Sequence, residues 1–506
     1  MAKLAVAIGL FALILVTAPL VAVAYRAGGL GLSAADWSAL RFTLWQALLS
    51  AILSVLLAIP VAKALSRRHF FGRSTLITLL GAPFLLPVIV AVMGLLALFG
   101  RSGVLNTALS ALGLPTLSIY GLQGVLIAHV FLNFPLATRM ILQGWQAIPA
   151  ERFRLAESLS FTPREIHRHL ERPMLIEVLP GTFATIFAMC LTSFAVALIL
   201  GGGPRATTLE LAIYQAVRFE FDLAHAAGLA LLQVLVGGLA ALVAWIAARQ
   251  AGFGAGLDRR LPLPAPTGWR LWLDSTAILF ATLFLLGPML AVLLPAISGL
   301  LDLPSQVWPA LARSLAVALG STLLTCVTAL VLALGAARGQ RWLDIAATLP
   351  LATSGLVLGT GLFVLLQPLI PPASLALPVT LLVNTLLALP FAYRLLLPEA
   401  RALETDYGRL ADSLGLHGLA RLRLLSLPRL ARPLGFSAGL TAALSMGDLG
   451  VIALFASESQ ATLPLVIQRL SGAYKQDVAA AASVLLVASS FALFWLFDRK
   501  GRNAQA

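Results

Sequence analysis

The stretch NFPLATR at residues 133–139 returns as ALPFAYR at residues 388–394, a shift of 255 positions (388 − 133). The same shift still pairs Asp222 with Asp477 far downstream. Matches that hold one spacing over such a distance mark an internal repeat. The chain therefore consists of two related halves.

Earlier in each half the shift between matching residues is larger. Gly94 matches Gly361 at a shift of 267 (361 − 94), and Arg67 matches Arg338 at a shift of 271 (338 − 67). Insertions in the loops of the first half would produce these steps, because 39 residues separate Gly94 from Asn133 (133 − 94) and only 27 separate Gly361 from Ala388 (388 − 361). The repeat therefore begins well before residue 133.

The composition places both halves in a membrane. Hydrophobic residues make up 59% of the 506 residues and charged residues 11%, whereas a soluble domain carries roughly 25% charged residues. So little charge would leave large apolar patches exposed, and such patches aggregate. Disorder, a coiled coil and a disulfide-built scaffold are excluded. Long apolar runs also exclude a transmembrane β-barrel, which shows ten-residue alternation.

Apolar runs long enough to cross a bilayer, about 20 residues each, occur six times in each half. Six is an even number, so the two repeats share one orientation and should be related by a pseudo-two-fold axis along the membrane normal. The predicted fold class is an all-α integral membrane protein with about twelve transmembrane helices. The runs are roughly 4–25, 40–66, 75–100, 120–147, 174–200, 223–249, 271–298, 309–337, 342–368, 374–398, 432–456 and 477–497.

Positive charge sets the orientation, because cytoplasmic loops are enriched in Lys and Arg. With the N-terminus in the cytoplasm, 27 of the 35 Lys and Arg residues fall on the cytoplasmic side. Both termini are therefore expected there. The net charge of +14 reflects this topology rather than a nucleic-acid surface, because the charge is spread over short loops.

These observations divide the chain into successive segments. They are an N-terminal membrane anchor helix (1–40), a first repeat (41–250), a cytoplasmic Gly/Pro-rich linker (251–270), the first helix of the second half (271–308), a second repeat (309–497) and a cytoplasmic tail (498–506).

The most polar cytoplasmic loop recurs in both halves. It reads ERFRLAESLSFTPREIHRHLERP at 151–173 and DYGRLADSLGLHGLARLRLLSLP at 406–428. Each copy predicts a short helix, a break and a second amphipathic piece that ends at a proline. A single loop of this kind could be a solvated connector. Recurrence in register favours a docking helix for a cytoplasmic partner.

The two loops resemble the signature of permeases from ATP-binding-cassette (ABC) importers, in which an alanine, a glycine four residues later and a final Leu-Pro recur. The first copy has serine at the glycine position, and both copies have arginine where the family has glutamate. The resemblance implies the type I ABC importer permease fold. The residues it places in the ATPase-coupling loops are Arg154, Ala156, Ser160, Pro173, Arg409, Ala411, Gly415 and Pro428.

Two further stretches narrow the resemblance to permeases of thiamine importers: GGGPRATTLELAIYQAV at 201–217 and SMGDLGVIALF at 445–455. The resemblance implies two copies of a cytoplasmic ABC ATPase, a periplasmic thiamine-binding protein and a bacterial inner membrane. It implies no enzyme activity and no cofactor in this chain, since ATP is bound by the partner. Free thiamine and its phosphate esters both remain open as substrates.

Three residues are candidates for the gate or pathway. A carboxylate inside an apolar span is costly and should face the bundle interior, so Asp448 is interpreted as a helix–helix hydrogen bond, a gating or packing residue, or a contact for the thiazolium cation. Gly202 and Gly203 form either a turn or an outer gate contact. The chain lacks a phosphate-binding G-x-x-x-x-G-K-[ST] motif, and no spacing points to a metal site or to catalytic residues.

Other functions remain as alternatives. An ABC permease for ferric iron or another small ion would share most of this pattern. A secondary transporter also uses parallel repeats. It would need intramembrane proton or sodium relays, and Asp448 alone is too few residues for such a relay. A membrane-embedded enzyme would need a convergent set of His, Asp or Cys, and the apolar runs contain none.

Overall fold

The computed structural model describes residues 2–27, 31–81, 86–203, 206–247 and 268–503. Within these ranges all regular elements are helical. Eleven helices are long and apolar enough to cross a membrane, and a bent pair brings the number to twelve. The predicted all-α fold with about twelve spans is confirmed.

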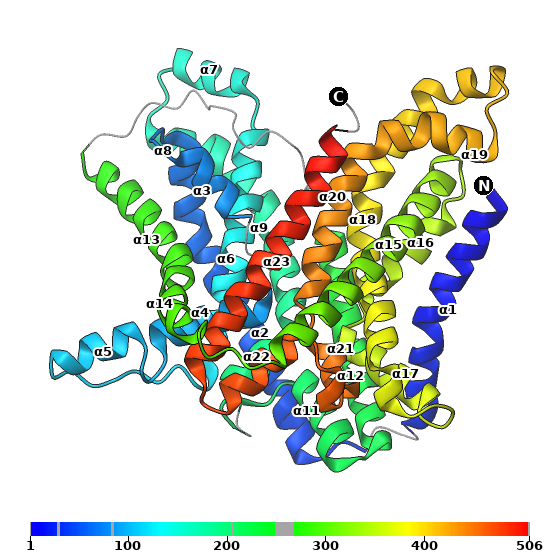
Figure 1. Cartoon of the computed structure of the whole chain (residues 1–506). Coiled ribbons are helices and arrows are strands. Elements are labelled where there is room, and N and C mark those ends of the chain that lie inside the picture. The colour runs from blue at the N-terminus through cyan, green and yellow to red at the C-terminus, as the bar shows by residue number, and fades with distance from the viewer. Residues whose placement is uncertain (1, 28–30, 82–85, 204–205, 248–267, 504–506) are drawn as a thin grey trace.

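The first half runs through a long series of helices (Figure 1). They are α1 (Ala2–Arg26), α2 (Ala34–Arg67), α3 (Arg73–Leu79), α4 (Val88–Phe99), α5 (Val104–Ala111), α6 (Leu122–Ala147), α7 (Ala150–Ser158), α8 (Pro163–Ile166), the π-helical turn η2 (His167–Glu171), α9 (Arg172–Leu191), α10 (Ala195–Leu200), α11 (Leu209–Gln215), the π-helical turn η4 (Ala216–Glu220) and α12 (Leu223–Ala247).

The second half repeats this order. Its elements are α13 (Trp269–Ala291), α14 (Leu293–Gly299), α15 (Val307–Ala337), α16 (Trp342–Thr348), the 3₁₀ turn η5 (Leu349–Ala352), α17 (Gly355–Leu366), α18 (Pro372–Ser413), α19 (Gly418–Arg421), the π-helical turn η6 (Leu422–Ser426), α20 (Leu427–Met446), α21 (Gly450–Phe455), the 3₁₀ turn η7 (Glu458–Gln460), α22 (Leu463–Gly472) and α23 (Gln476–Asn503).

Two predicted spans are interrupted at matching places. The run at 174–200 is divided between α9 and α10, and the run at 432–456 is divided between α20 and α21. The 342–368 run is sharply bent, by 95°, between η5 and α17. Broken helices inside a membrane leave backbone groups free, and the surrounding protein must satisfy them.

The register of the repeat changes near its end. The sequence pairs Asp222 with Asp477, but Asp222 directly precedes α12, whereas Asp477 is the second residue of α23. The starts of the two helices, Leu223 and Gln476, differ by 253 (476 − 223). Phe221 and Tyr474, the left-handed residues before them, show the same shift. The π-helical turn η4 accommodates extra residues in the first half, so the match between the two aspartates is wrong as a structural pairing.

The first helix of each half packs on the other half. Helix α1 contacts α15, α16 and α17, while α13 contacts α2 and α4. The exchange is reciprocal, as the pseudo-two-fold relation requires. The segment 1–40, predicted as an anchor, therefore also belongs to the packing of the second half.

The two halves share one apolar core at one end of the molecule. This core joins α4, α10 and α11 of the first half to α17, α21 and α22 of the second. At the other end the halves have separate cores, one formed with α13 and one with α1. The helices accordingly diverge towards α7 and α19 (Figure 1). We call the joined region the seam.

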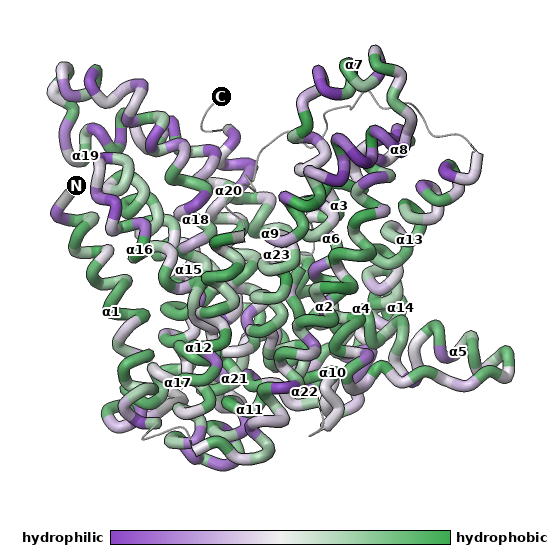
Figure 2. Tube along the Cα trace, turned by 180° about the vertical axis from the view of Figure 1, so that it is seen from behind, coloured by the Kyte–Doolittle hydropathy of each residue, from purple (hydrophilic) through white to green (hydrophobic). Residues whose placement is uncertain are grey.

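Both termini lie at the end of the molecule that carries α7 and α19 (Figure 1). Figure 2 shows hydrophobic residues along the long helices and hydrophilic residues gathered around α7, α8 and α19. This arrangement agrees with the relative placement of termini and polar loops expected from the sequence. Most of the predicted linker, 251–270, lies outside the described residues.

Candidate functional site: the coupling loops and the seam

The first coupling loop turns at the end of α7 through a Schellman cap. The Ser160 N–H donates to the Glu157 carbonyl at 2.9 Å, and the Phe161 N–H donates to the Ala156 carbonyl at 2.9 Å. This pair of bonds needs a left-handed residue after the helix. Ser160 takes that role with φ of 53°, a strained conformation for a residue with a side chain.

The second coupling loop has the same cap at the end of α18. The Gly415 N–H donates to the Asp412 carbonyl at 3.1 Å, and the Leu416 N–H donates to the Ala411 carbonyl at 2.9 Å. Gly415 has φ of 66°, which costs glycine little. The four-residue spacing from alanine to glycine in the signature is therefore the spacing of this cap.

The two loops differ where they leave the membrane. In the first half α6 ends before Pro149 and α7 begins anew, because the residue before a proline avoids the helical conformation and Ile148 is extended. The second half has Glu404 at the matching position, and α18, which is 42 residues long, continues through it to Ser413. The prediction of a separate short helix is right for the first loop and wrong for the second.

The segments 163–173 and 418–428 lead from the coupling loops back to the long helices, and we call them the return limbs. Their structure also corrects the sequence interpretation. Pro173 and Pro428 were expected to end the amphipathic pieces, but each lies in the first turn of a long helix, α9 or α20. Each is preceded by a π-helical turn, η2 or η6. The proline offers no N–H donor to the carbonyl four residues before it. The α-helical hydrogen bond is therefore missing there, and the chain forms the wider π-helical turn instead.

Different ion pairs tie the two loops to their helices. In the first loop Glu171 accepts from Lys63 Nζ at 2.6 Å and contacts His167 Nδ1 at 2.9 Å. In the second loop Arg421 pairs with Glu404 at 2.9 Å and with Asp412 at 2.7 Å. Both sets of contacts hold the return limb against the rest of its half.

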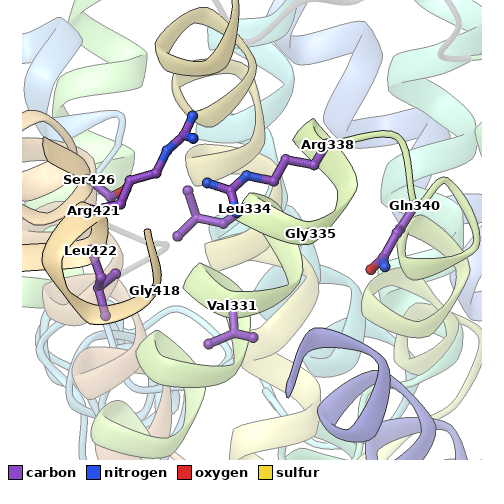
Figure 3. A pocket seen from close by; sticks show the side chains of 9 residues that line it. All are labelled: Val331, Leu334, Gly335, Arg338, Gln340, Gly418, Arg421, Leu422 and Ser426. Carbon is purple, nitrogen blue, oxygen red and sulfur yellow. The ribbon is translucent and has the colours of Figure 1, made fainter. Parts of the chain in front are cut away.

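A small cavity of about 80 Å³ lies beneath the second loop. Figure 3 shows Arg338 from the end of α15 and Arg421 from α19 at this cavity, with Leu422 below them. Glu404 bridges the two arginines, since it also pairs with Arg338 at 3.3 Å. The cavity therefore lies among the side chains that hold the second coupling loop in place.

Both loops present a matched exposed face. Leu155, Leu159, Leu410 and Leu414 occupy equivalent positions and are between 54% and 65% exposed. The neighbouring Arg154 and Arg409 are exposed as well, as are Pro173 and Pro428, whereas Ala156 and Ala411 are buried. We call Arg154, Leu155 and Leu159, with Arg409, Leu410 and Leu414, the docking face.

Asp448 lies at the break between α20 and α21. Its carboxylate faces the backbone N–H groups of Gly450, Val451 and Ile452 at the start of the half-helix α21. The Oδ2 atom is buried and has no hydrogen-bond partner among the described residues. The preceding Gly447 packs on Pro87 of the first half. The structure therefore places Asp448 at the seam.

Gly202 and Gly203 form a turn after α10. Their φ angles are 70° and 140°, which glycine adopts readily. A Cβ on Gly202 would lie 3.0 Å from Cβ of Tyr120, in the same half. The turn interpretation accounts for both glycines, and an outer gate contact stays a prediction.

Sequence reasoning missed one buried carboxyl group, that of Glu210 in α11. Gln233 Nε2 donates to Glu210 Oε1 at 3.1 Å, and the Ser354 side chain lies near the carboxyl group. Glu210 belongs to α11, which is not one of the spanning helices. Burial raises its pKa to about 8, and the Ser354 and Gln233 side chains oppose this shift. A charged residue within the apolar stretch TTLELAIYQAV (207–217) was the available signal.

No family model matches the chain, but full-length relatives do. It is 38% identical over 499 residues to the thiamine transport system permease protein ThiP of Brucella abortus (strain 2308), covering 95% of this chain and 92% of that protein. It is 38% identical to ThiP of Escherichia coli (strain K12), covering 93% and 90%, and 36% identical to ThiP of Haemophilus influenzae, covering 88% and 85%. Relatives of this similarity and coverage show that the chain belongs to the family of thiamine transport system permease proteins.

Proposed function

We propose that this chain is the membrane-spanning permease of an ATP-driven importer that carries thiamine across a bacterial inner membrane. Its termini and coupling loops face the cytoplasm. The chain makes and breaks no bond, and ATP is bound and hydrolysed by two copies of a partner ATPase. The substrate assignment is supported by the near full-length similarity to permeases named for thiamine transport.

The observation that carries the ATPase partnership is the pair of equivalent docking faces at one end of the molecule. Exposed apolar patches rimmed by polar residues mark interaction sites. Leu155 and Leu410 are exposed at matching positions in the two halves. Two related faces suit two copies of one partner.

Movement of the two halves is supported by the distribution of the cores. The seam closes one end, while separate cores at the other end leave each half free to move as a unit. Closure of an ATPase dimer would draw the coupling loops together and part the seam. A periplasmic binding protein would then deliver thiamine at the outer end, and reversal would release it towards the cytoplasm.

Transport by the reconstituted system tests this proposal. The chain is reconstituted in proteoliposomes with a partner ABC ATPase and a periplasmic thiamine-binding protein. Labelled thiamine should accumulate only when ATP is present on the side of the coupling loops. ATP-independent uptake driven by an ion gradient would overturn the proposal, as would accumulation of ferric iron without thiamine.

A further inference from the structure

Glu210 is buried at the seam without a cationic partner. Its side chain is 1% exposed, and the groups that act on its carboxyl within the described residues are Gln233 and Ser354, both uncharged. Gln233 Nε2 is itself held by the Leu191 carbonyl at 2.9 Å. Burial without a cation disfavours the ionised form of a carboxyl group, so a carboxyl group at this place calls for a reason.

Helix α11, which carries Glu210, packs on elements of both halves, α12 of the first and α17 of the second. Gln233 belongs to α12 of the first half, whereas Ser354 caps the start of α17 in the second. A second hydrogen bond crosses at the same end, from Arg218 Nη2 to the Ala456 carbonyl at 3.3 Å. Parting the seam therefore separates Glu210 from Ser354 and admits water to the carboxyl.

The repeat supplies an internal control for this site. Thr208 and Thr462 precede α11 and α22, so the counterpart of Glu210 is Pro464. Leu486 corresponds to Gln233 by the shift of 253, and Pro87 corresponds to Ser354, since each directly precedes its helix. The counterpart set is entirely apolar. The fold thus forms the same seam without a carboxyl group.

We propose that Glu210 is the specificity-determining residue that an organic cation meets when the outer end of the seam parts. The inference rests on the proposed function, because the thiazolium ring of thiamine carries a fixed positive charge and offers no N–H donor on that nitrogen. A carboxylate recognises such a charge electrostatically. Glu210 selects cationic over neutral substrates of the same shape.

The two states of the seam explain how one carboxyl can attract the cation and then release it. Water that enters the parted seam favours the ionised carboxylate, which burial disfavours. When the seam closes, burial again disfavours the ionised form, so the carboxylate takes up a proton from the water that leaves the seam and no longer holds the cation. The cation is then free to move towards the inner end, where the halves have separate cores.

The test compares a cation with its neutral isostere. The full complex in proteoliposomes is supplied with thiamine or with an analogue in which carbon replaces the quaternary nitrogen, each at a concentration shown by titration to saturate the binding protein. Glu210→Gln keeps the size and hydrogen bonds of the side chain. Thiamine uptake should fall about tenfold or more, while uptake of the neutral analogue changes less than about twofold.

Two further variants separate recognition from folding. Glu220→Gln removes a carboxyl on the neighbouring η4, whose side chain is 56% exposed, and both uptake rates should stay unchanged. Glu210→Leu places an apolar residue where the second half has one. Its melting temperature should match that of the unchanged chain, while its discrimination between the two substrates is lost.

The outcomes are distinguishable. Unchanged thiamine uptake by the Glu210→Gln complex would overturn the role of Glu210. Equal losses for the cation and the neutral analogue would also overturn it, because a structural role would affect both substrates. If the unchanged complex accumulates no thiamine, the proposed function fails instead.

Discussion

Gly94 of α4 lies directly against the backbone of Pro288 in α13, and a Cβ on Gly94 would stand 2.7 Å from the Pro288 carbonyl oxygen. The other half has the same contact in reverse, since a Cβ on Gly361 would stand 2.5 Å from the Pro19 carbonyl oxygen. The glycines therefore permit the exchange of first helices between the halves. Their match in the repeat is a requirement of close helix packing.

Replacing Gly94 with alanine should loosen this contact. The added methyl group meets backbone, which cannot move aside, and overpacking of this kind costs about 1–3 kcal/mol. The midpoint of thermal unfolding of the detergent-solubilised protein should fall. Gly287→Ala is the matched control, because its Cβ would lie 3.6 Å from a side-chain carbon of Leu98; an equal loss in both variants would contradict the packing argument.

The two coupling loops should respond in opposite ways to changes at the cap. Ser160→Gly relieves a left-handed residue that bears a side chain and should stabilise the end of α7 by up to about 1 kcal/mol. Gly415→Ala should destabilise the end of α18 by about 1–2 kcal/mol. Hydrogen exchange of the cap amides of Phe161 and Leu416 measures both effects. Faster exchange at Phe161 in Ser160→Gly would refute the cap assignment.

Bulk at Gly415 should interfere with the partner rather than with this chain. Apart from the glycine and its two chain neighbours, no atom of the described residues lies within 4 Å of a Cβ placed there, so an arginine side chain would project outwards. Gly415→Arg should insert normally but lose ATPase binding and substrate-stimulated hydrolysis. Gly415→Ala carries the same backbone strain without the bulk and should retain most of the binding.

The first loop offers a comparison for this prediction. Ser160 already carries a side chain at the equivalent position, so Ser160→Arg should reduce binding less than Gly415→Arg does. Membrane levels of each variant are measured first. Normal stimulated hydrolysis in the Gly415→Arg complex would exclude 406–428 as a docking loop.

The exposed leucines should contribute directly to docking. Replacing both Leu410 and Leu414 with glutamate puts charge into the proposed apolar contact and should weaken binding of the purified ATPase about tenfold or more. Leu301→Glu, at a site that is 91% exposed and away from the loops, should leave binding unchanged. Equal binding by the double variant and the control would remove the docking face from the interface.

The orientation in the membrane can be tested separately. A reporter active only in the periplasm should be silent when fused after residue 260 and active when fused after residue 303, between α14 and α15. The expectation comes from the bias of Lys and Arg towards the loop side. The reverse pattern would place both coupling loops outside the cell and end the assignment of an ATPase partner.

Local features of the sequence were sufficient for much of this result. Apolar runs predict spans because a helix must cover the thickness of the bilayer with its own residues. The alanine-to-glycine spacing predicts a cap because the cap is formed by adjacent backbone groups. Even the continuity of α18 was available, since Glu404 stands where the first half has the helix-ending Pro149.

The partners of a buried side chain depended on the tertiary structure. A repeat identifies Gly94 and Gly361 as equivalent, but it cannot say whether each packs on the first helix of its own half or of the other half. Both arrangements would bury the same apolar residues. Glu210 similarly looked like one charge in an apolar stretch. Its place at the seam follows from contacts with Gln233 and Ser354, which are far from it in the sequence. Spans and caps were determined by the sequence because neighbouring residues form them, whereas the exchange of helices and the seam required the packed chain.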